Sequence, residues 1–136
     1  MSEADCVGGS RKRLLLVADN SNFRRTLERI LCRCGYAVDG VESGQDALRQ
    51  LSLTRYDTVI SEVFLPGDLC GLTIMDRLRR SYPTLPVIFL AESENSRLRS
   101  VLESCERVTC LGVPVDVDQL KQLVATTTNW SLSSFR

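Results

Sequence analysis

The chain has 136 residues, which is enough to bury one hydrophobic core and too few for two. Its 17 basic and 17 acidic side chains cancel, so no bulk charge draws it to nucleic acid or to an anionic membrane surface, and a protein partner is the default expectation. No apolar run reaches the roughly 18 residues of a membrane-spanning helix, and the N-terminus lacks the apolar core of a secretory signal, so we expect a cytoplasmic protein.

The six cysteines would then lie in a reducing compartment, where disulfides are not expected. The chain has no histidine, which excludes the common mixed zinc sites. We expect four of the cysteines to be small, mostly buried hydrophobic residues, namely Cys32, Cys34, Cys105 and Cys110. A thiol switch is the alternative.

From Arg13 onward, short apolar runs alternate with amphipathic segments, as in β-α units that build a parallel sheet covered on both faces. The first run, residues 14–18, is continuously apolar, which is typical of a strand buried on both sides. Residues 19–21 can bond the free amides of a helix start. Apolar residues then recur at helical spacing over residues 23–34, and Gly35 fits a left-handed C-cap.

The same alternation continues to the end of the chain. Further strands are expected at residues 36–41, 58–63, 87–90 and 108–111. Further helices are expected after Ser43, over residues 72–80, after Ser93 and after Asp116. We predict one folded domain over residues 13–126, with a flexible tail over residues 1–12 and another over residues 127–136.

In a doubly wound parallel sheet, the groups that act together lie at the carboxyl ends of the strands. Two carboxylates, Asp19 and Glu62, are expected to face each other at this edge, where they could hold a hard cation such as Mg²⁺ weakly, with waters completing the shell. There is no Ser-base or Cys-base pair, no G-x-G-x-x-G motif and no P-loop. We therefore expect a protein that is not an enzyme.

Residues from about Arg13 to Ala125 resemble the CheY-like receiver domains of response regulators in the order and spacing of all five units. The segments that carry the resemblance are LVAD at 16–19, DTVISE at 57–62 with LPG at 65–67, LPVI at 85–88 and VP at 113–114. The resemblance implies an α/β fold, a flavodoxin-like (βα)5 sheet with strand order 2-1-3-4-5. It also implies a role in two-component, or phosphorelay, signal transduction.

Receivers of this family carry two adjacent acids after the first strand, a phosphoryl-accepting Asp after the third, a Ser or Thr after the fourth and a Lys-Pro pair after the fifth. Carried over position by position, the resemblance places here Ala18 and Asp19, Glu62, Ala91, and Val113 with Pro114. Cys110 stands where the family commonly has the aromatic residue that swings inward on activation. Of the acids, the hydroxyl and the lysine, only Asp19 is retained.

Each departure removes one part of the phosphorylation chemistry. Ala18 removes a carboxylate that would help to hold Mg²⁺, Ala91 removes a hydroxyl, and Val113 removes the ammonium that would pair a phosphoryl oxygen. We therefore expect a phosphorylation-independent pseudo-receiver that acts through protein contacts. It would require no cofactor, and Asp19 and Glu62 would bind Mg²⁺ weakly at best.

Three other interpretations of the site stay open. Glu62 could be a fixed partial mimic of the phosphorylated state, since its carboxylate lies one methylene further out than that of an aspartate, or it could be merely a tolerated acid. The chain could be a working receiver that accepts a phosphoryl group from a histidine kinase at Glu62 or a neighbour. Two other acids could be considered as acceptors, but we expect Asp57 to help start its strand and Asp68 to satisfy amides of the turn that begins at residues 65–67. The chain could instead be a thiol redox sensor that uses Cys110 or Cys70.

The resemblance also implies a contact surface. In receivers, the face of the fourth helix, fifth strand and fifth helix usually meets a partner or a second copy, and here it corresponds to roughly residues 93–125. Its exposed side chains should include Arg97, Arg99, Glu103, Gln119 and Gln122. We expect a signalling protein or histidine kinase, or a homodimer, at this face, and neither nucleic acid nor membrane.

Overall fold

The computed structural model describes residues 11–63, 71–92, 100 and 107–133, and within them the strands form one parallel sheet. The strands are β1 (Arg13–Val17), β2 (Ala37–Val41), β3 (Thr58–Glu62), β4 (Val87–Glu92) and β5 (Val108–Val113). Their order in the sheet is β2-β1-β3-β4-β5, and every adjacent pair is parallel. The predicted doubly wound α/β sheet is therefore confirmed.

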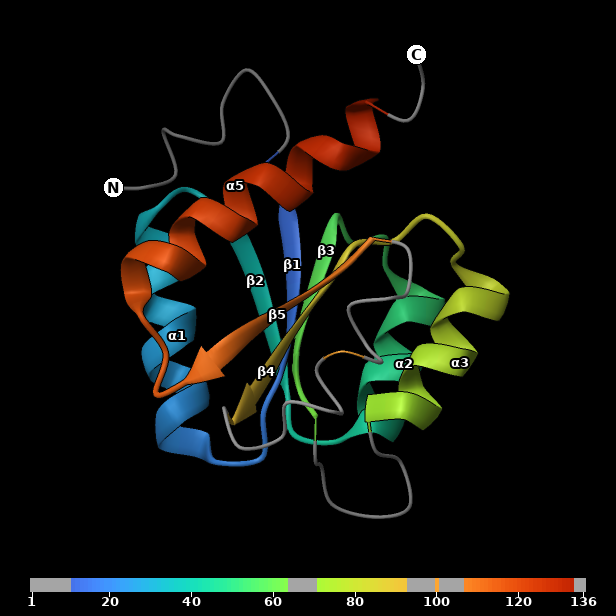
Figure 1. The fold of residues 1–136 in the computed structure, drawn as a ribbon, viewed down its shortest axis with the longest axis horizontal. Coiled ribbons are helices and arrows are strands. Elements are labelled where there is room, and N and C mark those ends of the chain that lie inside the picture. Colours follow the sequence, from blue (N-terminus) through green and yellow to red (C-terminus); the bar gives the residue numbers. More distant parts are fainter. Residues whose placement is uncertain (1–10, 64–70, 93–99, 101–106, 134–136) are drawn as a thin grey trace.

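The helices flank this sheet in two layers (Figure 1). They are α1 (Ser21–Arg33), α2 (Gly44–Leu53), α3 (Gly71–Ser81) and α5 (Val117–Ser133). In Figure 1, α1 and α5 lie on one side of the sheet, and α2 and α3 lie on the other. The turn at residues 65–67 lies outside the described residues, as does the helix expected after Ser93 apart from residue 100.

Local sequence signals set where these helices begin and end. The Asn20 side chain accepts a hydrogen bond from the Phe23 amide at 2.9 Å, and the Ser43 hydroxyl accepts one from the Asp46 amide at 3.1 Å. Asp116 accepts from the amide of Asp118 at 3.0 Å at the start of α5. The chain turns out of α1 at Gly35, whose φ of +98° is strained for any residue with a Cβ.

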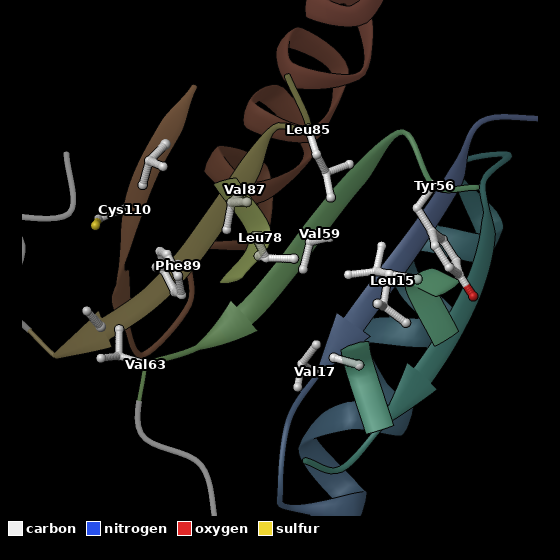
Figure 2. Close-up of a cluster of buried hydrophobic side chains, with 14 residues drawn as sticks. Leu15, Val17, Tyr56, Val59, Val63, Leu78, Leu85, Val87, Phe89 and Cys110 are labelled. Carbon is white, nitrogen blue, oxygen red and sulfur yellow. The ribbon is translucent and has the colours of Figure 1, made fainter. Parts of the chain in front are cut away.

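The core lies on both faces of the sheet, which explains why β1 is continuously apolar. Leu15 and Val17 pack toward α2 and α3, whereas Leu14 and Leu16 pack toward α1 and α5. Figure 2 shows the first of these clusters, in which residues of β1, β3 and β4 meet Leu78 of α3. This packing fixes the strand ends, and hence the side chains at the carboxyl edge.

The last helix, α5, extends beyond the predicted domain end at residue 126 and continues to Ser133. Thr127 is 0% exposed, and its hydroxyl accepts a hydrogen bond from the Thr58 hydroxyl at 3.1 Å. Thr128 is also buried. The prediction of a tail from residue 127 is therefore wrong for residues 127–133, because threonines whose hydroxyls have partners can be buried although the apolar pattern has ended.

The cysteine prediction is partly wrong. Cys110 is buried as expected, but Cys32 and Cys34 at the end of α1 are exposed, since the buried face of that helix is supplied by Leu27 and Leu31. Cys70 and Cys105 lie outside the described residues. No helix in the described part of the chain combines the length and the apolar character needed to cross a bilayer.

Candidate functional site

The carboxyl ends of the strands meet at one edge of the sheet, the lower edge in Figure 1. The Asp19 side chain follows β1 and is exposed, and Glu62 ends β3 and is half-buried. Ala91 lies near the end of β4 and Val113 ends β5. The structure therefore brings these predicted site residues to the same edge.

The central contact of this site joins Glu62 to the loop after β1. An oxygen of its carboxylate, Oε1, accepts a hydrogen bond from the backbone amide of Asp19 at 2.9 Å. The Glu62 side chain thus bonds the main chain of Asp19, a contact that the sequence pattern did not predict.

Arg24 of α1 holds the same loop, a role that the sequence pattern did not predict. Its guanidinium Nη1 donates to the carbonyl oxygen of Ala18 at 2.7 Å and is 3.4 Å from that of Asp19. A side chain at Gly40 on β2 would collide with the Glu28 carboxylate and come within 3.0 Å of the Arg24 Cδ. A glycine inside a strand was the available signal for this close approach.

The other family positions are apolar at this edge. Ala18 is 0% exposed, and Ala91 at 3% lies in the same buried cluster as Cys110. Val113 is 37% exposed at the end of β5, and the peptide bond that joins it to Pro114 is cis. No hydroxyl or ammonium stands at positions 91 and 113 to bond a phosphoryl oxygen.

The residues present fit a divalent cation poorly. Among the described residues, no three Asp, Glu, Cys or His side chains gather closely enough to hold a metal ion. One Glu62 oxygen already accepts the Asp19 amide, and Ala18 offers no ligand. Family members typically bind Mg²⁺ at this place, but hard cations need several oxygen ligands, and this edge supplies fewer than the family pattern.

Other proposed reactive groups lie in different surroundings. Asp57, at the amino end of β3, accepts a hydrogen bond from the Arg13 amide at 2.8 Å, which agrees with a role in starting its strand. Cys110 is buried in the same cluster as Ala91. Asp68 and Cys70 lie outside the described residues.

A second polar cluster lies at the amino edge of the sheet, opposite the candidate site. The Tyr56 hydroxyl donates to Asp39 Oδ2 at 2.6 Å and accepts from Gln50 Nε2 at 3.0 Å. Burial, followed by the hydrogen bond to Asp39, raises the pKa of Tyr56 above its usual value of 10.0. The Arg13 guanidinium lies 5.9 Å from the centre of the tyrosine ring.

Comparison with known proteins identifies the family. The model of the response regulator receiver domain matches residues 14–125. The chain is 36% identical over 117 residues to the sensor histidine kinase RcsC of Salmonella typhi, and 37% identical over 83 residues to the transcriptional activator protein IrlR of Burkholderia pseudomallei. These alignments cover 82% and 61% of this chain, but only 12% and 35% of the two relatives.

A solved structure shows the same fold. The signal receiver domain of an HD domain-containing protein from Pseudomonas fluorescens superposes with a TM-score of 0.83, at 23% identity, over 91% of both chains. The match of the family model covers most of the chain, and the sheet has the strand order of that fold. The chain therefore belongs to the response-regulator receiver domain family of two-component signalling.

Proposed function

We propose that this receiver domain signals without phosphorylation and acts as a binding module rather than an enzyme. The observation that carries the proposal is the state of Glu62, whose carboxylate occupies the phosphoacceptor position and is engaged by the Asp19 amide at 2.9 Å. A carboxylate that already accepts this bond, next to the apolar Ala18, lacks the surroundings that would neutralise an incoming phosphoryl group.

The apolar positions on β4 and β5 support the same proposal. Phosphoryl transfer depends mainly on positioned donors and cations, because charge spreads over the phosphoryl oxygens in the transition state. Ala91 and Val113 offer neither, and removing single donors of this kind from other active sites costs about two to three orders of magnitude in rate. Two such losses, together with a weaker metal site, leave little phosphorylation chemistry.

Receiver domains interact with histidine kinases or other proteins, and we propose β5 and α5 as the contact surface here. Gln119 and Gln122 are exposed on α5, as expected. Beside them, β5 and α5 border a hollow of about 590 Å³, whose lining includes Thr109 and Gly112. The residues Arg97, Arg99 and Glu103, expected on the same face, lie outside the described residues.

The test of the first proposal is intact mass after incubation with Mg²⁺ and a small phosphoryl donor such as acetyl phosphate. We expect no added phosphoryl group on the wild type. Glu62→Asp supplies the matched variant, because it places the family's own acceptor at this position while Ala18, Ala91 and Val113 stay in place.

Comparing the wild type with Glu62→Asp separates the effect of residue 62 from the effect of the residues around it. A phosphoryl adduct on the wild type would overturn the proposal and favour a working phosphoacceptor receiver. No adduct on either chain would show that the surrounding residues, and not the extra methylene of Glu62 alone, have removed the chemistry. For the contact surface, Gln122→Ala and Gln119→Ala should weaken capture of a partner or dimer formation, whereas Arg49→Ala on α2 should not.

A further inference from the structure

The loop between β1 and α1 is held at three backbone atoms by two side chains. Glu62 accepts from the Asp19 amide at 2.9 Å, and Arg24 donates to the Ala18 carbonyl at 2.7 Å. The Asp19 carbonyl lies 3.4 Å from the same guanidinium nitrogen. The peptide unit that joins residues 18 and 19 therefore has both its C=O and its N–H bonded by side chains from other elements.

The direction of the Asp19 amide explains why an acceptor is needed there. The Ala18 amide donates to the Val41 carbonyl on β2 at 3.0 Å, so the next amide along β1 points toward β3. The backbone pairing of β1 with β3 ends at Val17 and Ser61. Beyond this pair, the Glu62 carboxylate takes the place of a β3 backbone carbonyl as the acceptor for the Asp19 amide.

We infer that Glu62 is a positioning residue, which fixes the β1–α1 loop through the reach of its side-chain oxygen rather than through its negative charge. This clamp, formed by Glu62 and Arg24, holds the backbone of Asp19 in one place with no ligand from outside the chain. The inference goes beyond the proposed function, because it assigns Glu62 an internal task that neither presence nor absence of phosphorylation requires.

A matching contact lies at the other end of the same strand. Asp57 precedes β3 and accepts from the Arg13 amide at 2.8 Å, so acids at the two ends of β3 bond one amide at the start of β1 and one just beyond its end. At the amino end an aspartate reaches the amide, whereas at the carboxyl end the acceptor is a glutamate. We expect an aspartate at position 62 to leave a gap longer than a hydrogen bond, because its carboxylate is one methylene shorter.

A role of Glu62 through the length of its side chain and a role through its negative charge predict opposite results for two variants. Glu62→Gln keeps an acceptor oxygen at the same distance and loses the charge, whereas Glu62→Asp keeps the charge and loses the reach. If Glu62 acted by charge, as a mimic of a phosphoryl group would, Glu62→Gln would be the damaging change. If it acts as a clamp, Glu62→Asp and Glu62→Ala are the damaging changes.

The test is amide hydrogen exchange followed by NMR on the whole chain, with the Asp19 amide as the readout. We expect its protection to fall about tenfold or more in Glu62→Asp and Glu62→Ala, and to stay within about threefold of the wild type in Glu62→Gln. The amide of Arg13 should keep its protection in all three, and it should lose protection in Asp57→Ala, where Asp19 is unaffected.

A loss of Asp19 protection in Glu62→Gln as large as that in Glu62→Ala would overturn the inference, as would full protection in Glu62→Asp. The Arg13 amide shows whether a variant is folded, and if Glu62→Asp does not fold, Glu62→Gln alone decides between reach and charge. The intact-mass measurement detects phosphorylation, whereas hydrogen exchange detects the bond to the Asp19 amide. The proposed function and the clamp can therefore fail independently of each other.

Discussion

The added turns of α5 give the sharpest stability prediction, because a buried and an exposed threonine lie next to each other there. Thr127 is 0% exposed and accepts from the Thr58 hydroxyl at 3.1 Å. Thr126 is exposed, and its hydroxyl donates only back to the Gln122 carbonyl of its own helix, at 3.0 Å. Substituting each by alanine changes helix propensity equally, so the difference between the two variants isolates the tertiary contact.

The expected size follows from what Thr127→Ala removes. The hydrogen bond to Thr58 contributes about 1 kcal/mol net, and the single hydroxyl proton of Thr58, shared between Thr127 and the Asp57 carbonyl at 2.7 Å, can still be donated to that carbonyl, so no buried donor is left unpaired. The lost methyl group adds about 1 kcal/mol. Thr127→Ala should therefore be about 2 kcal/mol less stable than Thr126→Ala.

Urea unfolding monitored by circular dichroism measures this difference. With a slope of roughly 2 kcal/mol/M for a domain of this size, the midpoint of Thr127→Ala should lie about 1 M below that of Thr126→Ala. Equal midpoints would refute the reasoning, and they would return residues 127–133 to the tail that the sequence pattern predicts.

Three further predictions test other parts of the fold. Arg79→Met should cost about 2 kcal/mol in the same assay, because the guanidinium donates to the carbonyls of Tyr82 and Leu85 at 3.0 and 2.8 Å, and exposed Arg77→Met should stay within about 0.5 kcal/mol of the wild type. Gly40→Ala should cost less than about 1 kcal/mol of stability, because the Glu28 carboxylate can move aside. It should nevertheless shift the NMR resonance of the Asp19 amide by displacing Arg24, and an unchanged resonance would count against the close approach of Arg24 to Gly40. Tyr56→Phe should flatten the dependence of stability on pH at high pH. Because the folded-state pKa of Tyr56 is raised above 10.0, its protonated form stabilises the fold below about pH 10, and this contribution is lost as the pH rises through the folded pKa. Parallel stability profiles of the wild type and the variant above pH 10 would contradict the raised pKa.

The sequence alone determined the sheet, because the information for it is local. The continuous apolar run of β1 indicated a strand covered on both faces, and Asn20, Ser43 and Gly35 marked helix ends through short-range hydrogen bonds and one backbone angle. Alternating strands and helices of these lengths favour a parallel sheet, and parallel strands bring Asp19 and Glu62 to one edge. The resemblance to receivers added the strand order and the list of altered positions.

The tertiary structure decided how those residues are used, because the deciding contacts join residues far apart in the chain. Glu62 and Asp19 are 43 positions apart, and no spacing rule indicates that the glutamate side chain bonds the main chain of Asp19. Thr58 and Thr127 are 69 positions apart, and their hydroxyl pair lies where the buried face of α5 passes from Leu120 and Val124 to threonines. Whether a polar side chain is solvated, paired or buried depends on its three-dimensional neighbours, which periodicity does not record.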